Sequence, residues 1–163
     1  MATTNAATTY LEHRILNFIF NNNAQVSSAN FGSGNANGLG SNIYVGLATA
    51  VSNFSDSTGE SADAGSVSVT EATFGGYARQ QTTAWTLVSP TANQQTAKNT
   101  NAIDFPAKTD GGTQTITHVF INDASSSSGT NNFLFIGALD ASKTLAEGDI
   151  FRINATNLSI ELK

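Results

Sequence analysis

The residues best suited to chemistry in this 163-residue sequence include two histidines, His13 and His118. His118 lies in an alternating stretch between Thr117 and Val119. A metal site needs several converging ligands, and no spacing of His, Asp or Glu in this sequence resembles one; cysteine is absent altogether. We therefore predict no metal, and we interpret His118 as a polar-face or satisfied core residue. His13 is expected to be a solvated or interface side chain.

Acidic side chains offer the second possible chemistry. Several aspartates flank the ends of predicted strands, where Asp is favoured because its side chain hydrogen-bonds nearby backbone groups in turns. Catalysis by paired carboxylates requires two of them across a cleft, and nothing in their spacing indicates that. We predict no catalytic residue, no cofactor and no enzyme activity, with weak calcium binding in the polar loops as an open alternative. These aspartates are Asp104, Asp123, Asp140 and Asp149.

The most distinctive stretch is Gly-Gly-Tyr-Ala-Arg-Gln at residues 75–80. Two adjacent glycines give the backbone freedom for a turn, and the β-branched run that follows predicts a strand entry. Arg79 could clamp a ligand, but we favour a structural ion pair with a carboxylate near a strand end. Asp104 and Asp123 are the two candidate partners.

The aromatic residues of this region, Tyr77 and Trp85, could stack against a sugar. Each lies in an alternating context, however, and large aromatic side chains dominate protein cores and interfaces. We therefore expect core or interface anchors in preference to a sugar platform.

Charge is unusually sparse along the chain. Only 12% of the residues are charged, about half the usual share of ~25%. The 12 acidic and 7 basic residues give a net charge of −5, which argues against nucleic-acid binding. No apolar run approaches the ~18 residues of a membrane span, and no basic region precedes Arg14, so we expect neither a membrane partner nor a signal peptide.

Residues 9–22 are the one segment whose pattern predicts a helix, after an N-terminal arm at residues 1–8. Thr9 and Glu12 form a capping box, which satisfies backbone amides at a helix start. Leu11, Ile15, Phe18 and Ile19 recur at helical spacing, and Leu16 and Phe20 widen the apolar surface. Such a broad apolar surface must dock on the chain's own sheet or on a neighbouring subunit.

The remainder of the chain is predicted to be β-structure. Short alternating or apolar runs are separated by turn residues, which favours a single domain with an antiparallel β-sandwich or jelly-roll-like fold over residues 43–163. We expect a central strand at 115–121 and a strand at 133–139 that is buried on both faces or paired centrally. Polar composition predicts a turn at 92–99 and a connector at 141–147. The other expected strands cover 43–48, 67–69, 82–88, 102–106, 150–153 and 158–162.

The succession of short motifs resembles a family of small tailed-phage virion proteins, whose members include tail-fibre and capsid decoration (cement) proteins. The motifs that carry the resemblance are Tyr10-Leu11-Glu12 to Leu16-Asn17, Tyr44-Val45-Gly46-Leu47, Gly75 to Gln80, Ile103-Asp104-Phe105-Pro106, Thr117 to Ala124, Gly137-Ala138-Leu139 and Gly148 to Arg152. The resemblance implies a non-enzymatic virion protein and brings no catalytic residues with it. Two longer loops, at 30–41 and 52–66, depart from the family pattern.

Our leading hypothesis is a capsid decoration protein that binds neighbouring major capsid subunits or other virion proteins and forms a homo-oligomer, a dimer or a trimer. The alternative is a tail-tip or tail-fibre module that binds a host glycan. The expected location is the virion, with the capsid surface placed before the tail. The interface residues proposed from the sequence are Tyr10, Leu11, Ile15, Phe18, Tyr77, Arg79 and Trp85.

Overall fold

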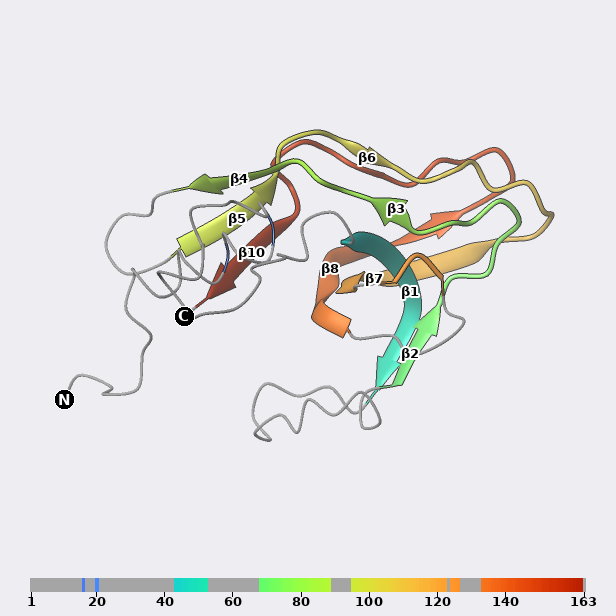
Figure 1. Cartoon of the computed structure of the whole chain (residues 1–163). Helices are drawn as coiled ribbons and strands as arrows, with labels where there is room; N and C mark the ends of the chain where they lie inside the picture. Colours follow the sequence, from blue (N-terminus) through green and yellow to red (C-terminus); the bar gives the residue numbers. More distant parts are fainter. Residues whose placement is uncertain are drawn as a thin grey trace. The chain divides into compact units, whose positions relative to one another are not determined.

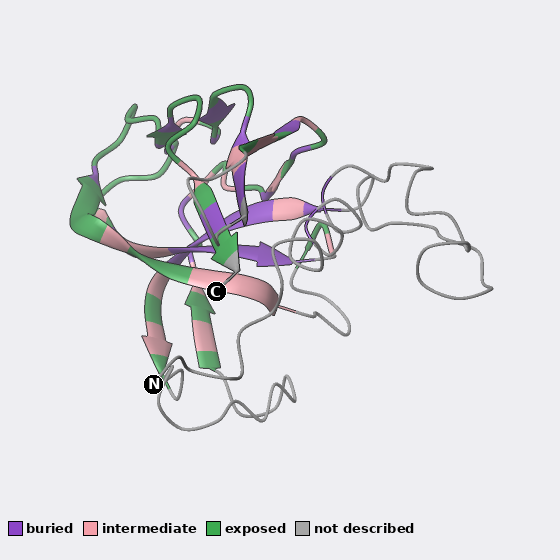
Figure 2. Ribbon diagram, turned by 90° about the vertical axis from the view of Figure 1, so that its left-hand side faces the viewer, coloured by how far each residue is buried: buried purple, intermediate pink, exposed green. Residues whose placement is uncertain are grey.

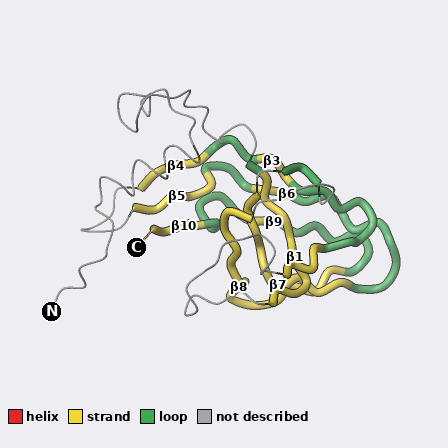
Figure 3. The backbone as a smooth tube through the Cα atoms, turned by 60° about the horizontal axis from the view of Figure 1, so that its bottom comes forward, coloured by secondary structure: helices red, strands yellow, loops and turns green. Residues whose placement is uncertain are grey.

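The computed structural model describes Leu16, Phe20 and residues 43–52, 68–88, 95–122, 124–126 and 133–162. In these residues the chain is mainly β, and the coloured part of Figure 3 consists of strands and loops. The chain forms two compact units, each assembled from separate stretches. One comprises Met1–Ile43, Thr82–Ile103 and Ile153–Lys163, and the other comprises Tyr44–Gln81 and Asp104–Arg152.

The second unit contains a five-stranded sheet with the order β2-β1-β7-β8, in which β3 also pairs with β1 (Figure 1). Each of these pairings is antiparallel. The strands are β1 (Tyr44–Ser52), β2 (Ser68–Glu71), β3 (Gln80–Gln81), β7 (Gln114–Asn122) and β8 (Phe133–Leu145).

The centre of this sheet is the pair β1 and β7. Val45 and Leu47 are fully buried, and they lie opposite Ile121 and Val119 on β7. Such β-branched and aliphatic cross-strand pairs are what stabilises a sheet whose inner face is covered. The prediction of a central strand at 115–121 is therefore confirmed, since β7 lies between β1 and β8.

The strand predicted at 133–139 exists as the start of β8, but the expectation that it is buried on both faces or paired centrally is wrong. β8 is an edge strand whose first four residues are half-buried and whose middle is mostly exposed, and Figure 2 shows this change along the long bent strand. Its near-continuous apolar start indicated a central strand, but apolar composition does not encode position within a sheet. The connector expected at 141–147 is also wrong, because β8 continues to Leu145, which is fully buried.

The first unit contains a three-stranded sheet with the order β10-β5-β4. Its strands are β4 (Trp85–Val88), β5 (Gln95–Asn99) and β10 (Ser159–Leu162). β5 corrects the turn expected at 92–99: it is the middle strand, although its residues are polar or small. Its buried side carries Ala97 opposite Leu87 of β4 and Ile160 of β10. The small methyl group of Ala97 allows the three strands to pack closely, although the polar composition of this stretch indicated a turn.

Asn99, at the end of β5, is fully buried and hydrogen-bonded on both sides of its amide. Its Nδ2 donates to the carbonyls of Asn101 (2.8 Å) and Asn154 (2.9 Å), and its Oδ1 accepts from the amide of Leu158 (2.9 Å). The amide of Thr156, which has a φ of 67°, donates to the Asn99 carbonyl (2.8 Å). These hydrogen bonds satisfy the buried amide, as is usual for buried polar groups. They also fix the turn that precedes β10.

Two short strands, β6 (Ile103–Asp104) and β9 (Arg152–Ile153), form a two-stranded sheet. Beside them, the amide of Phe105 donates to the carbonyl of Phe151 (3.0 Å), and the two rings meet edge to face. β6 ends before Pro106, as the missing proline amide predicts.

The predicted arm at 1–8 lies outside the described residues, as does the predicted helix at 9–22 except for Leu16 and Phe20, which are fully buried. Leu16 and Phe20 are both helical in conformation, and the elements of the described part of the chain are otherwise all strands. No helix within it is therefore long and apolar enough to cross a membrane. The sandwich arrangement and the single domain stay predictions.

Candidate functional site

The Gly75–Gly76 turn begins the Gly-Gly-Tyr-Ala-Arg-Gln segment. Neighbouring atoms leave no room for a larger residue at either glycine. The turn is closed by the amide of Tyr77, which donates to the Phe74 carbonyl (2.9 Å), and Gly76 has a φ of 87°. A Cβ on Gly75 would lie 2.7 Å from Thr109 Oγ1, and one on Gly76 would lie 2.9 Å from the Ala107 carbonyl oxygen. The turn therefore packs closely on residues 107–110, as predicted for a glycine-based strand entry.

The segment beneath this turn carries a buried lysine. Lys108 is 2% exposed, and its Nζ donates to Asp110 Oδ1 (2.6 Å), to the Asp110 carbonyl and to the Gly111 carbonyl (3.0 Å). The hydrogen bond from Lys108, with another from the Gly75 amide, holds the pKa of the Asp110 carboxyl below its usual range. The ammonium group is thus satisfied by the turn that follows it in sequence.

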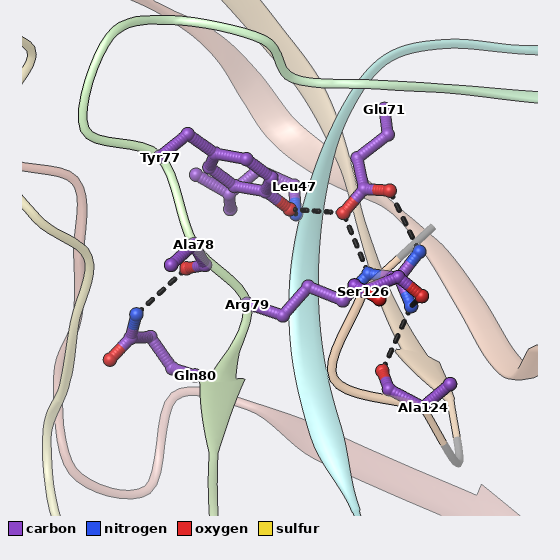
Figure 4. Close-up of polar contacts among 8 residues, drawn as sticks. All are labelled: Leu47, Glu71, Tyr77, Ala78, Arg79, Gln80, Ala124 and Ser126. Carbon is purple, nitrogen blue, oxygen red and sulfur yellow. Dashed lines mark hydrogen bonds and ion pairs between the residues drawn. The ribbon is translucent and has the colours of Figure 1, made fainter. Parts of the chain in front are cut away.

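Glu71, which precedes the glycine turn, and Tyr77 and Arg79, which follow it, form a connected polar cluster (Figure 4). Arg79 Nε donates to Glu71 Oε1 and Nη2 donates to Glu71 Oε2, both at 2.7 Å, which is the bidentate geometry of a strong ion pair. The Tyr77 hydroxyl donates to Glu71 Oε1 (2.8 Å) and accepts from the amide of Leu47 on β1 (3.0 Å).

The remaining side of the Arg79 guanidinium binds the segment that follows β7. Its Nη1 donates to the carbonyls of Ala124 (2.8 Å) and Ser126 (2.9 Å). With its amide oriented to satisfy both neighbours, Asn122 accepts from the same Nη1 and donates to the Ala124 carbonyl. The guanidinium carbon also lies 5.2 Å from the centre of the Phe120 ring, within cation–π range.

The cluster is shielded from water. The side chain of Arg79 is 2% exposed and that of Glu71 is 17% exposed. Burial raises the pKa of the Tyr77 hydroxyl above its usual value of 10, so the hydroxyl stays protonated and continues to donate to Glu71. A buried pair of this kind is costly to break from one side, because the charge left behind has no partner.

Geometrically, the cluster ties together parts of the second unit that are distant in sequence. Leu47 lies on β1, Glu71 ends β2, Arg79 precedes β3, and Ala124 and Ser126 follow β7. Each group binds another group of the same protein, so the arrangement positions backbone and does not present a reactive atom. The structural ion pair predicted for Arg79 exists, but its partner is Glu71.

Asp104, one of the two partners expected for Arg79, pairs with Arg152 instead. Arg152 Nη2 donates to Asp104 Oδ2 (2.6 Å), and this hydrogen bond lowers the pKa of Asp104 and raises that of Arg152. Both side chains are largely exposed, at 46% and 59%. The other expected partner, Asp123, lies outside the described residues.

Trp85 and Tyr77 do not offer an open surface to a sugar. Trp85 is 6% exposed and its ring centre lies 4.3 Å from that of Phe20, while Tyr77 stacks on Phe105 and meets Phe74 edge to face. Both are core anchors in their own units. The interface role expected for Tyr77, Arg79 and Trp85 stays a prediction, and the other four interface residues, Tyr10, Leu11, Ile15 and Phe18, lie outside the described residues.

His118 is half-buried, and its Nδ1 shares a hydrogen bond with Thr117 Oγ1 (2.7 Å). Across the described ranges, no group of three or more His, Cys, Asp or Glu side chains could hold a metal ion. Asp149 does what was expected of a turn aspartate, since its Oδ2 accepts from the amide of Ala146 (2.9 Å). His13 lies outside the described residues.

Sequence reasoning missed Glu71 and Asn99, which organise the two units. Glu71 ends a short strand whose exposure alternates, and only the need of a buried arginine for a carboxylate could have indicated it. Nothing in the polar stretch around Asn99 distinguishes it from its neighbours. Gly46 was also missed: a Cβ there would lie 2.1 Å from Cζ of Phe120, its cross-strand partner.

Comparison with known proteins gives one family. The family model described as "Podophage GP4 fiber I protein gp80" matches residues 6–161. No curated protein matches the sequence. The match extends over nearly the whole chain and includes both units.

Proposed function

Because the chain belongs to the family of the podophage GP4 fiber I protein gp80 and is thus a phage virion structural protein, we propose that it is a non-enzymatic component of a phage tail fibre. The match over residues 6–161 is the observation that carries this proposal. The family description favours the tail-fibre alternative over the capsid decoration hypothesis that we placed first from the sequence.

The geometry of the second unit is consistent with a mechanical task. A fibre component must hold its shape while it links other parts of a particle, and this requires rigid positioning without a reactive group. The cluster of Glu71, Tyr77 and Arg79 supplies such positioning, because it joins β1, β2, the entry to β3 and the segment after β7 through hydrogen bonds shielded from water. Satisfied buried networks rigidify a fold and specify one arrangement.

We further propose that the chain forms a homo-oligomer through its N-terminal segment. Leu16 and Phe20 are fully buried, and Phe20 contacts Trp85 of the same unit. In a helix each residue advances by about 100°, so Leu16 and Phe20 would share one side. Leu11, Ile15 and Phe18 would then lie on the opposite side, where an apolar stripe needs a cover. A neighbouring subunit supplies it.

Deletion of residues 1–20 would not test this contact, because it would remove the buried Leu16 and Phe20 and so destabilise the first unit itself. Ile15→Asp and Phe18→Asp should instead abolish the oligomer in sedimentation velocity while the thermal midpoint stays close to that of the unmodified protein. Phe20→Ala is the matched control: it should lower the thermal midpoint. An oligomer that persists in both aspartate variants would contradict the N-terminal contact.

The tail-fibre role is tested by particles that lack the protein. A phage with an amber mutation in its gene, grown in a non-suppressing host, should make DNA-filled heads of normal heat stability that adsorb poorly to the host cell. Adding the purified protein during assembly should restore adsorption. Normal adsorption by particles whose heads are fragile would support the decoration hypothesis and contradict the fibre assignment.

A further inference from the structure

The turn at residues 108–112 contains the one Asp-Gly dipeptide of the sequence, Asp110–Gly111. An aspartate followed by glycine is prone to spontaneous isomerisation, because a residue without a Cβ leaves its backbone nitrogen free to approach the preceding carboxyl carbon. Both residues are exposed, and a Cβ at Gly111 would meet nothing within 4 Å. The dipeptide is therefore accessible to water and sterically open.

The isomerisation needs only the groups of the dipeptide and water. The Gly111 nitrogen bonds to Cγ of Asp110 and loses its proton, while one carboxyl oxygen leaves as water, which closes a succinimide ring. Water then opens the ring at one of its two carbonyls. Opening at the former side-chain carbonyl restores aspartate, whereas opening at the main-chain carbonyl gives isoaspartate, in which the chain runs through Cβ and Cγ. The overall change is an isomerisation at constant mass, with no oxidation or reduction.

In the folded chain, three donors hold the Asp110 carboxylate. Lys108 Nζ donates to Oδ1 at 2.6 Å, and the amides of Gly75 and of Asp110 itself also donate to the carboxylate. None of these donors is the Gly111 amide, whose nitrogen has to reach Cγ. The same hydrogen bonds lower the pKa of Asp110 and so favour the ionised carboxylate, from which no oxygen can leave as water.

Lys108 also holds the backbone on both sides of the bond that would rearrange. Its Nζ donates to the Asp110 carbonyl and to the Gly111 carbonyl (3.0 Å). All three acceptors of this ammonium group therefore belong to the dipeptide. The lysine side chain is only 2% exposed, so water competes little for its three donors. Closure of the succinimide ring requires the Asp110 side chain and backbone to rotate, and these hydrogen bonds oppose that rotation.

We propose that Asp110–Gly111 is a site of spontaneous isomerisation and that Lys108 keeps it unreacted while the protein is folded. A buried ammonium group whose acceptors are the carboxylate and the two carbonyls of the reacting residues is placed to restrain every group that must move. The exposed position of the dipeptide supplies the water that the reaction needs, so the restraint comes from hydrogen bonding and not from burial of the dipeptide.

Isomerisation at this position would disturb a closely packed turn. Isoaspartate adds one carbon to the main chain between residues 110 and 111. The turn lies against the glycine turn before it, since the amide of Thr109 donates to the Gly75 carbonyl (2.9 Å) and a Cβ at Gly75 would lie 3.2 Å from the Asp110 nitrogen. A virion protein is not replaced after the particle is released, so such a change accumulates with the age of the particle.

Substitution of the lysine tests the proposal. Folded Lys108→Met, kept at neutral pH, should form isoaspartate at position 110 about tenfold faster than the unmodified protein, since the loss of a hydrogen bond to a charged group changes a rate by roughly this factor. The Asp and isoAsp peptides have equal mass and are quantified after chromatographic separation. Lys108→Met/Gly111→Ala is the matched control: its added Cβ has room in the fold and hinders the attack, so the rate should fall again.

The Asn37–Gly38 dipeptide provides an internal reference in the same digests. It forms the same type of succinimide by loss of ammonia, and its hydrolysis products are recognised by their increased mass. Its rate should be the same in the unmodified protein and in Lys108→Met. A selective increase at position 110 would then come from the missing lysine and not from a general loosening of the chain.

A second measurement needs no variant, which matters because a buried lysine can be essential to the fold. Unfolding of the unmodified protein in urea releases Asp110 from Lys108 and should accelerate isoaspartate formation about as much as Lys108→Met does. A folded Lys108→Met protein that isomerises at the unmodified rate would overturn the proposal. Equal rates at position 110 in the folded and the urea-unfolded unmodified protein would overturn it as well.

Discussion

The carboxylate of Glu71 accepts two hydrogen bonds of 2.7 Å from the guanidinium of Arg79, eight residues further along the chain. The same carboxylate also accepts from Tyr77, so the first and third residues of the Tyr-Ala-Arg segment converge on one acidic group. The pair is largely buried. We therefore assign the segment at residues 75–80 a structural role in the second unit.

Removal of one partner from this ion pair should lower the stability of the fold strongly. Arg79→Met is expected to lower the free energy of unfolding by about 3 kcal/mol, because it leaves the Glu71 carboxylate and two backbone carbonyls without their donor. Urea denaturation followed by circular dichroism measures the loss. Arg152→Met, which breaks the exposed pair with Asp104, should change little. Similar losses in the two variants would contradict a structural role specific to the buried pair.

Gly76 and Gly112 both have a positive φ, but only Gly76 has close neighbours, so substitutions at the two positions separate backbone strain from steric crowding. Gly112 has a φ of 74° and free space around it, so Gly112→Ala should cost about 1 kcal/mol for the backbone conformation alone. Gly76→Ala adds a contact of 2.9 Å with the Ala107 carbonyl oxygen and should cost more than that. Thermal unfolding of both variants provides the comparison, and an equal loss would contradict the close packing of the turn on residues 107–110.

Gly46 is predicted to be irreplaceable for a different reason. Its backbone lies under the Phe120 ring, and Gly46→Ala should destabilise the protein by about 1–3 kcal/mol because a new Cβ would overlap three ring carbons. The double variant Gly46→Ala/Phe120→Leu should recover part of the loss, while Gly137→Ala on β8 should be tolerated. A double variant no more stable than Gly46→Ala would show that the ring is not the obstacle.

Asn99 should be sensitive to the loss of its amide nitrogen. Asn99→Asp replaces a donor to two carbonyls by an acceptor, and we expect a loss of about 2–3 kcal/mol in the free energy of unfolding. The fluorescence of Trp85, the one tryptophan of the chain, reports on the same unit. Asn101→Asp, an exposed substitution of the same type, is the control. Equal effects at both positions would contradict the clamp.

Stability should fall in acid. The pKa values of Asp104 and Asp110 are lowered in the folded chain by hydrogen bonds from Arg152 and Lys108. A lowered pKa contributes stability above the unfolded value of about 4, and that contribution is lost as the pH falls through the folded value. Thermal midpoints from pH 6 to about pH 2 should therefore drop below about pH 4, and less so in Asp104→Asn/Asp110→Asn. An equal drop in that variant would assign the effect to other carboxylates.

How far the fold could be predicted depended on whether local pattern or tertiary context decided each element. Alternation at 115–121, the proline after β6 and the paired glycines at 75–76 are local signals, and the structure confirms each. The edge position of β8 and the strand at 95–99 depend on which strands lie beside them in the sheet. Amino-acid composition does not carry that information, so both predictions were wrong.

The candidate site shows the same division. A basic residue beside a glycine turn indicated a structural ion pair, and the pair exists. Its partner could not be chosen from the sequence, because Glu71, Asp104 and Asp123 are all near predicted strand ends and only the fold decides which of them lies beside Arg79.

The location of the protein on the particle tests the central proposal most directly. Gold-labelled antibody against the purified chain, imaged by electron microscopy on intact phage, should mark the tail fibres and leave the capsid surface bare. Particles from the amber mutant described above should carry no label. Labelling spread over the capsid surface, with none on the tail, would contradict the fibre assignment.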